Sequence, residues 1–141
     1  MKENCIDTNI ILEIMSPNLV AGSKEEKILH GIFSTGGIVS VQTLNELVSV
    51  TRKWANTGVP GWDMDKVKTF AASVRSRFTV IPVTDVTHID ALDIMERYRL
   101  SWWDSLIVAA AVHHGCPILW SKDMHHGLVV DKVTTIKNPF K

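Results

Sequence analysis

The stretch that decides the fold runs from Ser101 to Asp123 and reads SWWDSLIVAAAVHHGCPILWSKD. Its middle, Leu106 to Val112, is apolar on every helical face, and a helix that is hydrophobic all round is expected to be buried. Gly115 supplies the helix stop. The run PILW at 117–120 is short and continuously apolar, which is typical of a strand buried on both faces of a parallel sheet. The stretch therefore predicts a buried helix followed by a buried strand.

Each half of this helix–strand unit carries one carboxylate at an end. Asp104 lies in the first turn of the predicted helix, and Asp123 lies just past the carboxyl end of the predicted strand. In an open parallel sheet, ligands bind outside the carboxyl ends of strands and at helix N-termini, so both acids are candidates for a functional site. Each also has a structural interpretation. Ser101-x-x-Asp104 has the form of a capping box, and Asp123 fits an N-cap of the segment 124–128.

Length and composition indicate one globular domain, residues 1–141. Hydrophobic residues make up 45% of the chain and charged residues 21%, which are values of a folded protein. The charges of fifteen basic and fifteen acidic residues cancel, so the net charge gives no indication of binding to nucleic acid or to a membrane. If several acids gather in one cleft, however, the remaining surface is net basic.

The cysteines and the hydropathy pattern point to a reduced, soluble, cytoplasmic protein. Cys5 and Cys116 lie in or beside apolar segments, and nothing resembles a disulfide framework or a cysteine-based metal site. The N-terminal residues 1–4 lead into no long apolar region. The longest apolar run, Leu106 to Val112, is far below the ~20 residues of a membrane span.

Predicted strands alternate with predicted helices along the chain. The strands are expected at 5–6, 38–39, 78–83, 117–120 and 133–136, and six or seven helices separate them. Alternation of this kind predicts βαβ units. We therefore expect an α/β fold, a three-layer α/β/α domain with a central parallel sheet of five strands.

Two further acids lie on these elements. Asp7 ends the first predicted strand in a strand-to-helix turn, where it also fits an N-cap. Glu46 lies on the predicted helix from Val41 to about Trp54, roughly opposite the centre of its apolar stripe. By periodicity alone, Glu46 is expected to be solvated.

Four segments of the chain resemble a PIN domain and, more narrowly, the VapC-type toxin ribonucleases of bacterial and archaeal toxin–antitoxin modules. They are Asp7-Thr8-Asn9, Glu46, Trp103 to Ile107 and Ser121 to Met124. The resemblance covers essentially the whole chain, and its most specific segment is 102–127. It implies a PIN-like fold in which four acids meet at the carboxyl edge of the sheet and bind Mg²⁺ or Mn²⁺. Carried over position by position, these acids are Asp7, Glu46, Asp104 and Asp123.

The resemblance also implies supporting residues. Asn9 is a polar support, and Ser105 and Ser121 are expected to add hydrogen bonds to metal-bound water. One departure from the family pattern is Lys122, because this branch often has an acid directly before the fourth acidic residue. The lysine either weakens the binding of a second ion or contacts phosphate. The resemblance overrules the periodicity on Glu46, which it places at the site.

The implied activity is a metal-dependent endoribonuclease that hydrolyses RNA phosphodiester bonds, acts as a toxin, binds a cognate antitoxin and forms a homodimer. Carboxylate oxygens suit hard divalent cations, which generate a nucleophile from bound water. Two alternatives keep the fold: a PIN-like RNA-processing nuclease that is not a toxin, and a catalytically inactive PIN-like binding protein. The compact chain favours the toxin, and the intact acidic quartet argues against the inactive protein. A Rossmann-like nucleotide-binding protein is disfavoured because no G-x-G-x-x-G follows the first strand.

Other motifs are interpreted structurally. The doublets His113-His114 and His125-His126 do not form the i, i+4 pair of a helical zinc site. The doublet Trp102-Trp103 before Asp104 favours core packing over a base-stacking platform. Basic side chains on the helices are compatible both with RNA-phosphate binding and with a solvated surface.

Overall fold

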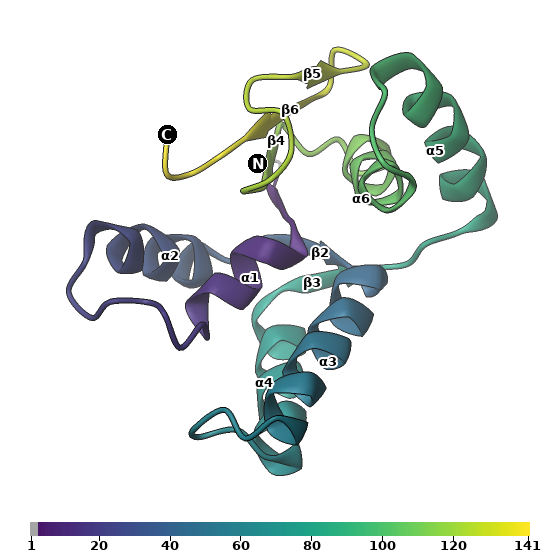
Figure 1. Cartoon of the computed structure of the whole chain (residues 1–141). Coiled ribbons are helices and arrows are strands. Elements are labelled where there is room, and N and C mark those ends of the chain that lie inside the picture. Colours follow the sequence, from purple (N-terminus) through teal and green to yellow (C-terminus); the bar gives the residue numbers. More distant parts are fainter. Residues whose placement is uncertain (1–2) are drawn as a thin grey trace.

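The computed structural model describes residues 3–141, so Met1 and Lys2 of the predicted domain lie outside it. Within that range a central sheet is surrounded by helices (Figure 1). The strands are β1 (Cys5–Ile6), β2 (Ile38–Ser40), β3 (Thr79–Ile81), β4 (Ile118–Trp120), β5 (Val129–Val130) and β6 (Thr134–Lys137). The helices are α1 (Thr8–Ile14), α2 (Lys24–Thr35), α3 (Val41–Asn56), α4 (Met64–Arg77), α5 (Asp85–Tyr98) and α6 (Trp102–His113). The predicted α/β fold with a mostly parallel central sheet is confirmed.

The strand order is β3-β2-β1-β4-β6-β5. Along the parallel strands, the direction in which the chain adds strands to the sheet changes between β3 and β4. From β1 the chain adds β2 and then β3 on one side. Helices α5 and α6 then carry it to β4, which pairs with β1 on the other side. The Asp7 N–H donates to the Trp120 carbonyl at 2.9 Å, which joins the carboxyl ends of β1 and β4. Ligands of open α/β sheets bind at such a topological switch point.

The predicted number of strands was wrong, because the sheet has six strands rather than five. The additional strand, β5, is antiparallel to β6 and pairs Val130 with Thr134. The turn between them places Asp131 and Lys132 at φ angles of 51° and 58°. A strand of two residues is too short to show periodicity, and Asp-Lys lacks the Asn-Gly or Asp-Gly signal of a tight hairpin.

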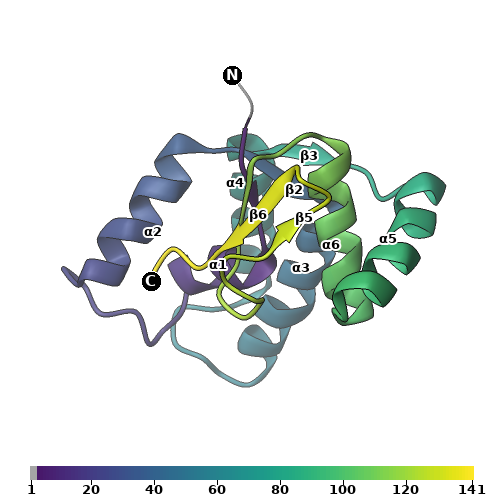
Figure 2. The same cartoon turned by 90° about the horizontal axis from the view of Figure 1, so that it is seen from above.

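Successive residues of the central strands point to opposite faces of the sheet, which gives the chain two apolar cores. Figure 2 shows the helices α5 and α6 on one side of the sheet and α2 on the other. Cys5 packs under α5 and α6, whereas Ile6 packs with the helices α1 to α4. Helix α6 is buried as predicted, with every residue from Ser105 to Ala111 at most 6% exposed. Its N-terminus is thereby fixed against the sheet.

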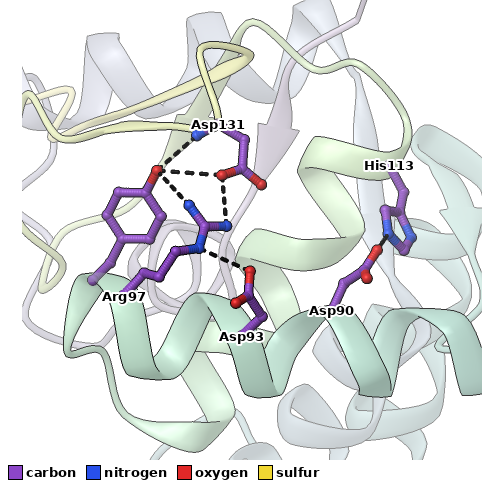
Figure 3. Close-up of polar contacts among 6 residues, drawn as sticks. Asp90, Asp93, Arg97, His113 and Asp131 are labelled. Carbon is purple, nitrogen blue, oxygen red and sulfur yellow. Dashed lines mark hydrogen bonds and ion pairs between the residues drawn. The ribbon is translucent and has the colours of Figure 1, made fainter.

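A polar network ties α5 to its neighbours (Figure 3). The Arg97 guanidinium lies 2.8 Å from Asp93 on the same helix and 2.7 Å from Asp131 in the β5–β6 turn. One turn earlier, Asp90 pairs with His113 at the end of α6. These contacts attach α5 both to the hairpin and to the buried helix.

Gly37 offers a test of how closely β1 and β2 approach. A Cβ on Gly37 would lie 2.5 Å from the Asn4 carbonyl oxygen, which already accepts a hydrogen bond from the Ile38 N–H, and the φ of Gly37 is 140°. We expect Gly37→Ala to lower the free energy of unfolding by about 2 kcal/mol or more, because both the clash and the backbone conformation oppose it. Urea denaturation measures the change.

Gly31 is the matched control, since it lies inside α2 and a Cβ added there would have no atom within 4 Å. Gly31→Ala should raise stability by about 0.5–1 kcal/mol through helix propensity. Equal effects of the two substitutions would contradict the close approach of the strands.

Candidate active site

The four predicted acids come from four different elements that all reach the carboxyl edge of the sheet. Asp7 follows β1 and caps α1. Glu46 lies in the second turn of α3, which begins directly after β2, and Asp104 lies in the first turn of α6. Asp123 comes three residues after the end of β4. Parallel strands end at one edge, which is why residues so distant in the chain gather there.

Asp7 is the most buried of the four acids, with 5% exposure. One carboxylate oxygen accepts from the Thr8 N–H at 2.7 Å, and the other accepts from the Ser121 hydroxyl at 2.8 Å. Burial raises the pKa of Asp7 to about 7, although both hydrogen bonds lower it. The negative charges of Asp104 and Glu46 raise it further. The hydrogen bonds thus fix the geometry of this carboxylate and favour its charged form, but the effect of burial outweighs them.

Asp104 is half-buried at the start of α6. Its N–H donates to the Ser101 side chain at 3.2 Å, so the N-cap half of the predicted capping box is present. Burial raises the pKa of Asp104, a side-chain hydrogen bond with Ser101 lowers it, and the charge of Asp123 raises it. The Ser101 hydroxyl therefore caps the helix, and the charge of Asp104 is coupled to that of another acid.

Glu46 is half-buried at the edge of the site rather than solvated, so the expectation from periodicity was wrong. Its carboxylate accepts from the Thr8 hydroxyl at 2.8 Å and from the Gln42 amide at 3.5 Å. The apolar stripe indicated the wrong buried side of α3. Val41 and Val48, which belong to the stripe, are 37% and 41% exposed, whereas Gln42 is 8% exposed. Polar residues occupy part of the inward side of α3 next to the site.

Asn9 connects α1 to the loop after β4. Its amide donates to the Asp123 carboxylate at 3.3 Å, and its carbonyl oxygen accepts from the Lys122 N–H at 3.1 Å. The segment 124–128 forms no helix, so Asp123 is not a helix cap. The prediction of Asn9 as a polar support agrees with these contacts.

Lys122, the departure from the family pattern, pairs with an acid that the sequence analysis missed. Its ammonium lies 2.6 Å from Glu13 at the C-terminal part of α1. Glu13 follows Asn9 by four residues, and this spacing places both on one helical face. That spacing is the signal by which Glu13 could have been found. The Lys122 ammonium therefore forms its ion pair with Glu13 and not with one of the four predicted acids.

The two predicted serines differ in position. Ser121 donates to Asp7, as described above, and is fully buried. The Ser105 hydroxyl donates instead to the Ser101 carbonyl at 2.7 Å, within α6. Ser121 is therefore hydrogen-bonded to one of the four acids, whereas the Ser105 hydroxyl is hydrogen-bonded to the backbone of its own helix.

The donor chemistry of the site fits a hard divalent cation. Its four carboxylates supply only oxygen ligands, which Mg²⁺ and Mn²⁺ prefer. Among residues 3–141, none of these four acids forms an ion pair with a lysine, arginine or histidine. Within the same range, no three acidic, histidine or cysteine side chains converge closely enough to form a finished ligand shell. The four acids thus have the oxygen ligands that a divalent cation needs and lie at the same edge of the sheet, but their side chains do not converge on one point.

The sequence matches the family described as PIN domain over residues 5–129, which is most of its length and includes all four acids. The chain belongs to the PIN domain family. Nucleases of this family generally use divalent metal ions, in agreement with the donor chemistry. No curated protein sequence matches the chain.

Several solved structures share this fold. A toxin–antitoxin complex from Klebsiella pneumoniae superposes with a TM-score of 0.69 at 16% identity, covering 96% of this chain and 97% of that one. FitAcB from Neisseria gonorrhoeae gives a TM-score of 0.63 at 15% identity over 96% and 97%. The Mycobacterium tuberculosis toxin VapC20, which cleaves the sarcin–ricin loop, gives 0.62 at 16% identity over 84% and 88%. At these identities the likeness concerns the fold.

Substituting Asp7 tests the electrostatic description of this PIN-domain site. The folded-state pKa of about 7 exceeds the ordinary aspartate pKa, so between about pH 4 and 7 the native state binds more protons than the unfolded state. Stability therefore falls as the pH rises through this window. We expect metal-free Asp7→Asn to be more stable than the wild type at pH 8, by up to about 4 kcal/mol, and to match it near pH 4. Thermal unfolding in chelator between pH 4 and 8 measures the difference.

Ser121→Ala serves as the control for this experiment. It should lower stability at pH 8 in the wild type, because the hydroxyl stabilises the ionised Asp7. In the Asp7→Asn background its pH-dependent effect should disappear. Parallel stability curves for the wild type and Asp7→Asn would show that Asp7 is not held in the way described.

Proposed function

We propose that this protein is a metal-dependent endoribonuclease that hydrolyses RNA phosphodiester bonds in the cytoplasm and acts as the toxin of a toxin–antitoxin pair. The observation that carries the proposal is the position of four carboxylates, without a basic partner among residues 3–141, at the switch point of a PIN-domain sheet. The RNA-cleaving activity of VapC20 and the toxin–antitoxin nature of another structural neighbour support it.

In this proposal Asp7, Glu46, Asp104 and Asp123 hold Mg²⁺ or Mn²⁺. When bound, the cation lowers the pKa of water to provide the nucleophile and stabilises the negative charge that develops on the phosphate. Positive charge also stabilises the ionised form of Asp7, which burial alone disfavours. A lysine or arginine paired with these acids would compete with the cation for them.

The remaining polar residues orient the carboxylates. Thr8 and Ser121 fix the two oxygens of Asp7, and the Thr8 hydroxyl also donates to Glu46. Asn9 holds Asp123 from the side of α1. Such supporting hydrogen bonds typically change metal affinity or activity by ~10–100-fold when they are removed.

The proposed partners are RNA, a cognate antitoxin protein and a second copy of the chain. An antitoxin would distinguish the toxin from a PIN-like nuclease of RNA processing, because both would use the same acids. A catalytically inactive binding protein would have no need for four acids at one edge of the sheet.

The first experiment tests metal dependence and Asp104 together on antitoxin-free protein. We expect single-stranded RNA to be cleaved with Mg²⁺ or Mn²⁺ and to remain intact in excess chelator. Asp104→Asn should abolish cleavage while its melting temperature stays within a few degrees of the wild type, because Asn retains the size of the side chain. Undiminished cleavage in chelator, or full activity of Asp104→Asn, would refute the mechanism.

Glu46 is tested by a Mg²⁺ titration, because its metal role rests on resemblance and position. We expect Glu46→Gln to raise the Mg²⁺ concentration needed for half-maximal cleavage by about 10-fold or more. The matched control is Glu96→Gln, on an exposed turn of α5 away from the site. A titration of Glu46→Gln that overlays the wild type would remove this residue from the set of ligands.

A further inference from the structure

A groove lies between the first turns of α3 and the N-terminus of α6, beside the acids. It has a volume of about 530 Å³, and its lining combines apolar side chains, among them Val41, Val83 and Leu106, with the polar side chains of Gln42, Asn45, Glu46 and Ser49. Trp103 lines it as well and is 63% exposed, so the expectation that this tryptophan packs in the core was wrong. Its neighbour Trp102 does pack against the core and against His88.

The groove is continuous with the site of the proposed function. Glu46 lines the groove and also accepts the hydrogen bond from Thr8, whose backbone N–H donates to Asp7. Trp103 directly precedes Asp104 at the start of α6. A group held in the groove is therefore adjacent to Glu46, one of the four acids.

Gln42 connects the two helices that form the groove, and its side-chain oxygen has no hydrogen-bond partner among the described residues. Its amide nitrogen donates to the Trp103 carbonyl at 3.3 Å, which ties α3 to α6 and determines which way the amide is oriented. The side chain lines the groove and is 8% exposed, yet its carbonyl oxygen has no hydrogen-bond partner among the described residues. A buried acceptor without a donor is costly, and this oxygen is itself buried rather than open to the groove.

We propose that the α3–α6 groove binds an unpaired nucleobase of the RNA next to the cleaved phosphate, with Trp103 as the stacking surface. A nucleobase is a flat apolar ring with polar edges, and the groove combines an exposed indole and aliphatic side chains with the polar side chains of Asn45 and Ser49. Unstacked bases of single-stranded RNA are commonly held on aromatic side chains. The inference rests on the proposed ribonuclease function and adds to it a selection of the substrate sequence.

The test measures binding of short single-stranded RNAs in which one nucleotide at a time is made abasic. An Asp7→Asn background prevents cleavage during the measurement. Trp103→Ala should weaken binding of the intact RNA by about 5–100-fold, the usual effect of removing a stacking aromatic. One abasic position should weaken binding to the Trp103-containing protein and have no further effect on Trp103→Ala. Trp103→Phe should restore most of the affinity.

Val20→Ala is the control, because Val20 is 67% exposed in the α1–α2 connection and does not line the groove. It should bind all RNAs as the parent protein does. Sedimentation of each variant reports whether the groove instead serves a protein interface. A change of oligomeric state in Trp103→Ala, with equal loss for intact and abasic RNAs, would overturn the nucleobase assignment, and so would unchanged RNA binding.

Cleavage by the wild-type protein separates this inference from the proposed function. If the wild type cleaves RNA while no abasic position depends on Trp103, the ribonuclease stands and the groove assignment fails. If the wild type cleaves no RNA with any cation while one base depends on Trp103, the groove assignment stands and the ribonuclease fails.

Discussion

The buried carboxylate of Asp7 is the constraint on which the rest of the site depends. The backbone N–H of this residue closes the junction between β1 and β4, and its side chain both caps α1 and accepts from Ser121. Because the carboxylate is 5% exposed, its charge is unfavourable until positive charge arrives. The same residue that caps α1 is thus free to serve in the proposed metal site, and the capping interpretation does not compete with the functional one.

Helix α6 holds a second acid of the site, Asp104, in a fixed position. Its residues from Ser105 to Ala111 are enclosed by the apolar core, so the first turn cannot shift without disturbing α5 and the sheet. Asp104 and Trp103 project from that first turn. A site built on a packed helix is held more firmly than one built on a loop.

The sequence alone supports the prediction of the α/β fold because burial and periodicity leave a local pattern. The apolar helix and the run at 117–120 were recognisable because burial on all faces excludes charged residues. Glu46 shows where this reasoning fails. A site adjacent to a helix replaces apolar residues on the inward side with polar ones such as Gln42 and Thr43, and the apparent stripe then rotates away from the true buried face. The strand β5 has two residues, too few to show a pattern. The spacing of Asn9 and Glu13 places Glu13 on the helical face of the site, but its ion pair with Lys122 is a tertiary contact that this spacing does not encode.

The strand order also decides when such a site can first exist. Ser121 and Asp7 are hydrogen-bonded although 114 residues separate them, and β4 pairs with β1 only after α5 and α6 have been made. A nascent chain that still lacks β4 has Asp7 without Ser121, and it has no Asp123 at all. During translation the four acids can therefore be brought together only after the segment that carries Ser121 and Asp123 has been made. In the proposed ribonuclease, a nascent chain that has not reached β4 would hold an incomplete set of acids, so its synthesis would precede its activity.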